Sequence, residues 1–139
     1  TAETETLLVH VVTPEGALHE GEAAFVAVPA ADGELGVLPH HTPLIAQLGI
    51  GELRVQPTEG GEGALFAVRG GFLQVVADKV TLLATEALPP AEIDTEALEE
   101  ERKEILEKLL HPASDEEYRE LLAERRWLET REKVAKHTA

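Results

Sequence analysis

Two consecutive prolines, Pro89 and Pro90, separate a half of the chain with apolar residues at every second position from a half with helical spacing. Proline has no backbone N–H to donate to a sheet, and it pushes the preceding residue toward an extended conformation. A β-sheet is therefore expected to end here. We expect residues 1–88 to form a β-domain and residues 89–139 to form an antiparallel two-helix hairpin.

The first half contains short apolar segments separated by turn-forming glycine, proline and aspartate. The clearest signal is a hairpin in which residues 72–76 and 80–83 alternate on either side of the turn Ala77-Asp78. Many short strands at regular spacing favour a sandwich or a barrel. The other candidate strands are residues 7–12, 23–28, 51–55 and 64–68.

The second half carries start signals for two helices. Asp94 is placed to cap the first, and Ser114 with Glu117 three residues later forms a capping box for the second. The apolar residues near helical spacing are Leu98, Ile105, Leu106, Leu109 and Leu110, followed by Tyr118, Leu121, Leu122, Leu128 and Ala135.

Charged residues interrupt both apolar stripes, at Glu101 and Arg102 in the first helix and at Arg125 in the second. Narrow stripes bury little area, so the hairpin is expected to be marginal alone and able to fold back or extend. Glutamate–lysine pairs at i,i+4 would support solvated helices. These pairs are Glu99–Lys103, Glu104–Lys108, Glu129–Lys133 and Glu132–Lys136.

Composition disfavours several classes of function. The formal net charge of −15 repels phosphate backbones, so nucleic-acid binding is disfavoured. With no cysteine, disulfides and thiolate chemistry are excluded, and a cytosol-facing protein is the simplest interpretation. We expect neither a signal peptide nor a membrane-spanning segment, because the first residues lack basic and apolar regions and no apolar run is long enough to span a bilayer.

Residues 32–44 combine glycines, prolines, an acid and two histidines, which indicates either an ordinary turn or an exposed recognition loop. His40 and His41 raise the possibility of a metal site, with His10, His19 or Glu34 as further ligands. Adjacent histidines on an extended segment point to opposite faces, and no zinc spacing is present, so we expect no metal. With no cysteine and a single serine, Ser114, in a helix cap, nucleophilic catalysis by serine or cysteine is disfavoured, and we expect no catalytic site.

Two further groups have alternative interpretations. The segment Arg69-Gly70-Gly71-Phe72 lacks the lysine and the following helix of a phosphate-binding loop, which favours a bend or bulge between strands. Arg125, Arg126 and Arg131 lie near the only tryptophan, Trp127, and form either a site for an acidic partner or an ordinary charged helix face.

Three motifs resemble one known family. Residues 33–44 resemble the G-E-L-G-x-L-P-x-H-x-P-L signature of epsilon subunits of bacterial F-type ATP synthases. Residues 12–16 are similar to the family's V-T-P-x-G, and residues 68–84 to its V-x-G-G-F-L-x-V and V-T-x-L-A. The resemblance covers essentially the whole chain.

The resemblance implies a sandwich of about ten strands in the central stalk, a non-catalytic rotor subunit that links the gamma subunit to the ring of c subunits during proton-coupled ATP synthesis. It implies a regulatory helical arm that inhibits ATP hydrolysis when extended toward the alpha and beta subunits. It also implies a peripheral location on the cytoplasmic face of the cell membrane. By motif position, the candidates at the c-ring and gamma interfaces are Glu34, Leu35, His41 and Pro43, and those for the beta subunit are Arg125, Arg126 and Arg131.

One departure bears on nucleotide binding. Some family members bind ATP in the folded hairpin through a motif like I-D-x-x-R-A, which suggests an alternative function as an ATP-sensing module. Here Ile93 and Asp94 are kept, but Ala97 stands where the arginine belongs. The chain therefore lacks a bidentate phosphate contact, and we expect weak or no ATP binding and no cofactor.

Overall fold

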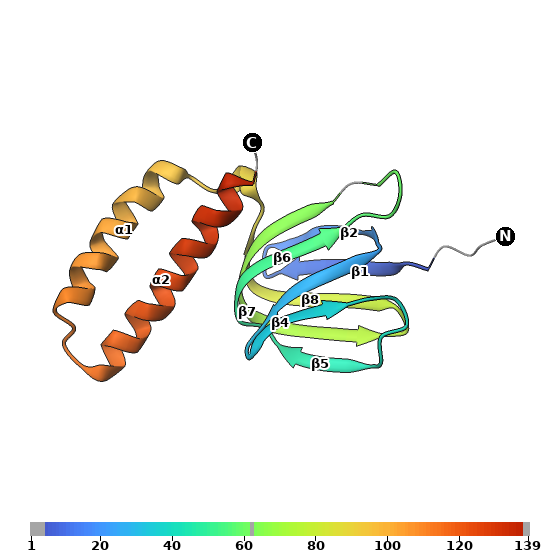
Figure 1. Ribbon diagram of the computed structural model, residues 1–139, viewed down its shortest axis with the longest axis horizontal. Coiled ribbons are helices and arrows are strands. Elements are labelled where there is room, and N and C mark those ends of the chain that lie inside the picture. Colours follow the sequence, from blue (N-terminus) through green and yellow to red (C-terminus); the bar gives the residue numbers. More distant parts are fainter. Residues whose placement is uncertain (1–4, 62, 138–139) are drawn as a thin grey trace.

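The computed structural model describes residues 5–61 and 63–137, which form a β-sandwich with a two-helix arm at its side (Figure 1). A 3-10 turn, η1 (Pro90–Glu92), follows the last strand. The strands are β1 (Leu7–Thr13), β2 (Gly16–Ala23), β3 (Phe25–Ala30), β4 (Gly33–Val37), β5 (Leu44–Gln47), β6 (Ile50–Gln56), β7 (Ala64–Val76) and β8 (Lys79–Leu88). The helices are α1 (Thr95–Leu110) and α2 (Asp115–Lys136).

The strands form one continuous sheet that folds over on itself. Their order is β2-β1-β8-β7-β6-β3-β4, with β5 paired to β7, and only the pairing of β1 with β8 is parallel. The first part of β7 pairs with β6 and its second part with β5, so β7 belongs to both layers.

The bend in β7 lies at Gly70 and Gly71, whose φ angles of 72° and 117° are unfavourable for other residues. A Cβ at Gly71 would lie 2.0 Å from the carbonyl oxygen of Leu83. The predicted sandwich and the predicted bend are both confirmed. The described residues form eight strands, where the family resemblance implies about ten. The two strands expected at 64–68 and 72–76 are one bent strand, β7.

The remaining strand predictions hold with local corrections. The 72–83 hairpin is confirmed, with Ala77 and Asp78 at positive φ in its two-residue turn. The strand expected at 23–28 forms at 25–30, and the strands β2, β4 and β5 were not predicted. Residues 33–37, expected within a loop, form β4 because they pair with β3.

The core lies between the two layers and follows the alternation along the strands. Val9, Leu73 and Leu82 from one layer and Val26 and Leu53 from the other have no exposed surface. The sequence neighbours of Val9, Leu73 and Leu82 are exposed or only partly buried, as the period of two requires. Strand β3 departs from this pattern, since Ala27 beside Val26 is also buried.

Both helices begin where predicted. Asp94 accepts hydrogen bonds from the backbone N–H groups of Glu96 and Ala97, and Ser114 Oγ accepts one from Glu117. Leu98, Ile105 and Leu128 pack between the helices. Three residues expected on the buried stripes are exposed instead, since they face away from both the partner helix and the sandwich: Leu106 (44% exposed), Leu110 (73%) and Tyr118 (45%).

Two of the three charges expected to interrupt the apolar stripes, Glu101 and Arg102, join the helices instead. Arg102 Nε donates to Glu132 Oε2 at 3.0 Å, and Arg131 Nη1 donates to Glu101 Oε2 at 3.0 Å. Each arginine binds both oxygens of its glutamate, because the antiparallel packing places each guanidinium opposite a carboxylate. Glu132 is hydrogen-bonded across the hairpin to Arg102, and Lys136, its expected partner, adds a weaker favourable charge interaction.

The predicted i,i+4 pairing is wrong at Lys103, whose ammonium lies 3.5 Å from Glu100 at i,i+3 and not beside Glu99. Positions three and four residues apart are both neighbours on a helix, so an exposed lysine reaches either.

Strand β8 ends at Leu88 and η1 begins at Pro90. That residues 1–88 and 89–139 act as separate domains stays a prediction.

Candidate functional site

The first group of predicted site residues lies at the β3–β4 turn. Glu34 is 62% exposed, and its Oε1 accepts a hydrogen bond of 3.1 Å from Arg54 Nη2 on β6. Leu35 points the other way and packs, partly buried, against the sandwich core. Glu34 is thus presented on the surface, whereas Leu35 anchors its strand.

His41 and Pro43 lie beyond the other end of β4, in the connection to β5. The backbone N–H of His40 donates to Asp78 Oδ1 at 2.6 Å, which ties this connection to the β7–β8 turn. His41 Nδ1 lies 2.7 Å from the carbonyl oxygen of Thr42. The extended strand β4 separates Glu34 from His41, so the candidates form two sites rather than one.

The two other histidines considered as metal ligands, His10 and His19, lie on strands β1 and β2. His19, on β2, meets the ring of Phe66 edge-on with centroids 6.1 Å apart, and burial lowers the pKa of its imidazole. His10 lies 3.7 Å from Glu20. Within residues 5–61 and 63–137, no three His, Asp or Glu side chains gather in a metal-binding arrangement.

An apolar surface on the outer face of the sheet was not singled out from the sequence. Phe72 on β7 and Leu83 on β8 are direct cross-strand neighbours, and they are 58% and 55% exposed. Ile45 on β5 and Val76 at the end of β7 extend the surface, at 73% and 45% exposed. The available signal was that residues on both faces of the 72–83 hairpin are apolar, although only one face can point into the core.

A small apolar cluster joins the arm to the sandwich. Trp127 of α2 is 4% exposed and packs with Val134 against Ala67 of β7. Ile93 borders this cluster, which gives that residue of the nucleotide motif a packing role. The cluster is much smaller than the sandwich core, so the arm is held by few apolar contacts.

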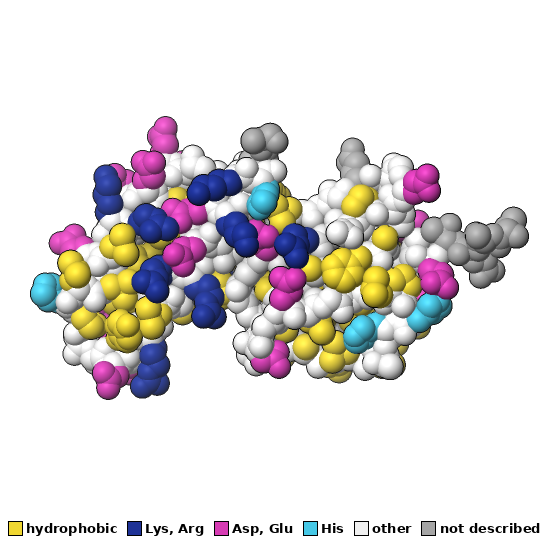
Figure 2. Space-filling view, in the orientation of Figure 1, with side chains coloured by type: hydrophobic (Ala, Val, Ile, Leu, Met, Phe, Trp, Pro, Cys, Tyr) yellow, Lys and Arg dark blue, Asp and Glu magenta, His cyan; other side chains and the backbone are white. Residues whose placement is uncertain are grey.

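The three arginines of the predicted acidic-partner site have different environments. Arg131 is bonded to Glu101, and its guanidinium lies 5.1 Å from the Trp127 ring centroid. Arg126 is exposed beside the cleft described below, and Arg125 is half-buried. Figure 2 shows lysine and arginine side chains gathered on the arm and its junction with the sandwich, despite the acidic composition of the whole chain.

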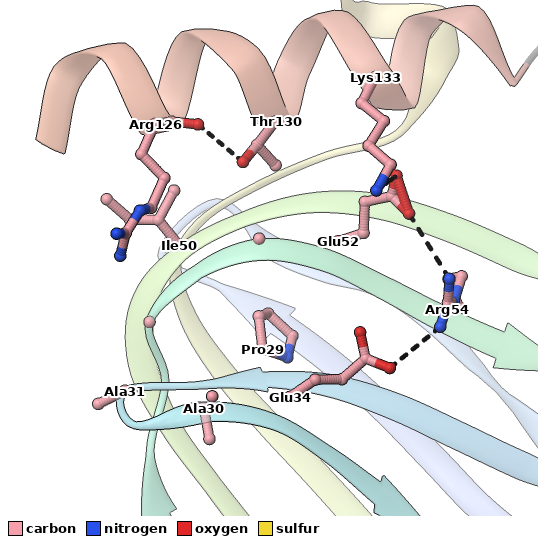
Figure 3. Close-up of a pocket in the computed structure, with 13 residues that line it drawn as sticks. Pro29, Ala30, Ala31, Glu34, Ile50, Glu52, Arg54, Arg126, Thr130 and Lys133 are labelled. Carbon is pink, nitrogen blue, oxygen red and sulfur yellow. Dashed lines mark hydrogen bonds and ion pairs between the residues drawn. The ribbon is translucent and has the colours of Figure 1, made fainter. Parts of the chain in front are cut away.

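A cleft of about 330 Å³ separates α2 from the sheet (Figure 3). The charged groups that line it are Glu34, Glu52, Arg54, Arg126 and Lys133. The Glu52 side chain is only 9% exposed, and its Oε2 has no hydrogen-bond partner among the described residues. That oxygen lies 3.9 Å from Lys133 Nζ and 3.8 Å from His137 Nε2, at the C-terminal end of α2.

The side chain of Asp94, in the nucleotide motif, already accepts hydrogen bonds within the chain. Asp94 Oδ1 accepts from the N–H groups of Glu96 at 3.1 Å and of Ala97 at 3.3 Å. A carboxylate in this role stabilises the start of α1. Weak or absent ATP binding stays a prediction.

Comparison with known proteins identifies the family. The β-sandwich domain of the ATP synthase Delta/Epsilon chain matches residues 6–90. The chain belongs to this family. An ATP synthase epsilon chain of Halalkalibacterium halodurans is 45% identical over 111 residues, which cover 80% of this chain and 81% of the relative. An epsilon chain of Alkalilimnicola ehrlichii is 40% identical over 119 residues, 86% of this chain and 84% of the relative.

Two solved ATP synthase structures share the epsilon-family fold. A chain of the Euglena gracilis mitochondrial OSCP/F1/c-ring structure matches with a TM-score of 0.80 at 24% identity, over 96% of this chain and 84% of that one. A chain of the Tetrahymena thermophila mitochondrial central stalk and c-ring structure matches with a TM-score of 0.65 at 12% identity, over 97% of this chain and 99% of that one.

No helix within the described part of the chain is long and apolar enough to cross a membrane.

Proposed function

We propose that the chain is a non-catalytic subunit of the central stalk of an F-type ATP synthase, in which the sandwich links gamma to the c ring and the arm restrains ATP hydrolysis. The observation that carries the proposal is the match to named epsilon chains, which extends beyond the sandwich into the arm at 40% identity over 86% of the chain. In this proposal the subunit needs no cofactor and stays peripheral, on the cytoplasmic face of the membrane.

The exposed apolar surface supports a contact with the gamma subunit. Phe72, Leu83, Ile45 and Val76 lie on one outer sheet face, and exposed apolar patches of this kind mark interaction sites. The turn that follows Val76 contains Asp78, which holds the connection carrying His41. One partner could therefore cover the apolar face and His41 together. We assign the contact with the c ring to the β3–β4 turn, which carries Glu34.

The arm supports the regulatory part of the proposal. Few apolar residues hold it against the sandwich, so its release costs less than unfolding the sandwich. In the folded arm, Arg131 is bonded to Glu101. An extended arm would place Arg125, Arg126 and Arg131 against acidic surfaces of the beta subunit, provided that Arg131 exchanges Glu101 for a carboxylate of the partner.

Adding the purified chain to a catalytic α3β3γ assembly tests this function. The full chain and a version truncated after Leu88 should both bind, and only the full chain should slow ATP hydrolysis. Equal rates with both forms would remove the regulatory role and leave the anchoring role standing.

A further inference from the structure

We propose that a row of alternating charges, Glu34, Arg54, Glu52 and Lys133, connects the exposed β3–β4 turn to the arm, so that a cationic partner group bound to Glu34 loosens the arm. The inference rests on the proposed function, because it assigns the partner to the c-ring contact and the movement to the regulatory arm. The coupling between Glu34 and the arm lies within this chain, so it can be measured in the isolated chain.

The row runs across the cleft from one element to the next (Figure 3). Arg54 Nη2 lies 3.1 Å from Glu34 Oε1, and Arg54 Nη1 lies 4.0 Å from Glu52 Oε1. The other oxygen of Glu52 lies 3.9 Å from Lys133 Nζ. The Arg54 guanidinium is shared between Glu34 and Glu52, and the Glu52 carboxylate is shared between Arg54 and Lys133. In each case one partner lies toward the β3–β4 turn and the other toward the arm.

This sharing makes the two ends of the row interdependent. Glu34 holds Arg54 at hydrogen-bonding distance and keeps it from a closer approach to Glu52. The Glu52 side chain is nine-tenths buried, where solvent screens charge less than at the surface, so its Oε2 attracts the ammonium of Lys133. If Arg54 moves fully onto Glu52, the carboxylate is neutralised and its attraction for the end of α2 falls.

The exposed end of the row defines the partner chemistry. Glu34 is 62% exposed next to the turn, so an incoming lysine or arginine side chain can reach its carboxylate. That contact would free Arg54 to approach Glu52, which weakens the hold on Lys133 and favours release of the arm. Coupling of this kind is reciprocal, so release of the arm would raise the affinity of Glu34 for the cationic group.

The test measures arm position in the full-length chain after Glu34 is neutralised. The chain has no cysteine, so spin labels can be attached at cysteines introduced at the exposed positions Glu15 and Glu104. Pulsed electron resonance then gives the ratio of docked to released arm. Mild urea, kept below the concentration that changes the circular dichroism of the sandwich, brings both states into the measurable range.

Four variants complete the design: Glu34→Gln, Arg54→Gln, the double variant and Glu22→Gln. Glu22 is an exposed carboxylate on β2 and controls for the loss of one charge. Glu34→Gln should shift the ratio about threefold toward the released arm, the scale of a partly exposed ion pair. Glu22→Gln should leave the ratio unchanged, and Glu34→Gln should have no further effect once Arg54 is glutamine.

An equal effect of Glu34→Gln with and without Arg54, or an effect no larger than that of Glu22→Gln, would overturn the proposal. Glu52→Gln gives a second, independent check. The row predicts that this variant releases the arm, whereas a dominant cost of burying the Glu52 charge would make it dock more tightly. Neither readout depends on ATP hydrolysis, so failure here is distinct from failure of the proposed function.

Discussion

The guanidinium of Arg69, beside the bend of strand β7, lies 5.9 Å from the ring centroid of Trp127 on α2. The other arginine near this ring, Arg131 at 5.1 Å, belongs to the arm itself. The bend of the sheet and the arm therefore meet at one aromatic ring. Trp127 is the only tryptophan, so its emission reports on this junction directly.

Replacing Trp127 with alanine should release the arm. The ring is 4% exposed, and truncating a buried tryptophan costs about 3–5 kcal/mol. Limited trypsin digestion should then cut α2 rapidly while the sandwich stays intact. Leu110→Ala, at a site 73% exposed, is the control and should digest like the unaltered chain. Unchanged digestion of the Trp127 variant would show that the ring does not hold the arm.

The hairpin should lose stability in acid through Glu132. The hydrogen bond from Arg102 lowers the pKa of Glu132 below its ordinary value of about 4.5. A lowered pKa in the folded state gives stability that is present above 4.5 and is lost as the pH falls through the folded value. Glu132→Gln should flatten this part of the profile of urea unfolding against pH. The same substitution at exposed Glu107 should leave the slope as it is.

His19 should affect stability in a higher pH window. Burial lowers the pKa of its imidazole below 6.5, so the unfolded chain takes up this proton first as the pH falls. Stability should therefore decrease from about pH 6.5 down to the folded pKa, and His19→Leu should remove that decrease. NMR titration of the His19 ring checks the cause. A ring that titrates at or above 6.5 in the folded chain would contradict it.

Gly71→Ala should prevent the sandwich from closing normally. The added Cβ would lie 2.0 Å from the backbone oxygen of Leu83, and the φ of 117° disfavours any side chain. We expect a loss of more than about 3 kcal/mol in the free energy of unfolding, from overpacking and backbone strain together. Gly60→Ala, at φ 80° with open space around its Cβ position, should cost only about 1–2 kcal/mol. Similar costs at both positions would refute the close approach.

The chain should bind ATP weakly or not at all. Ala97 offers no guanidinium, and its backbone N–H together with Asp94 caps the helix. Calorimetric titration of the full chain at physiological salt should show no tight binding, and Ala97→Arg should raise the affinity. Tight binding by the unaltered chain would favour the ATP-sensing alternative.

Local signals predicted those features whose cause is local. The 72–83 hairpin, the caps at Asp94 and Ser114, and the bend at Gly70-Gly71 depend on turn chemistry and on period, which a sequence displays directly. The candidate residues Glu34 and His41 came from a family motif and not from physical reasoning.

Features that depend on tertiary contacts were missed. Arg102 and Glu132 are thirty residues apart, and only the closed hairpin brings them together. Glu52 alternates with buried Leu53 along β6 and resembles an ordinary outward-facing strand residue until α2 covers it. Leu106 and Leu110 fit a helical stripe by spacing, but the sequence does not show which side of that stripe the partner helix occupies.

Binding of the full chain to a gamma-containing α3β3γ assembly is the most direct measurement of the central claim, made with a variant of the apolar face. Phe72→Asp should weaken association at least tenfold, because a carboxylate would be buried in an apolar contact. Leu18→Asp, at an exposed leucine of edge strand β2, should bind like the unaltered chain. Association that is unaffected by Phe72→Asp, or no association of the unaltered chain with a matched assembly, would contradict the account.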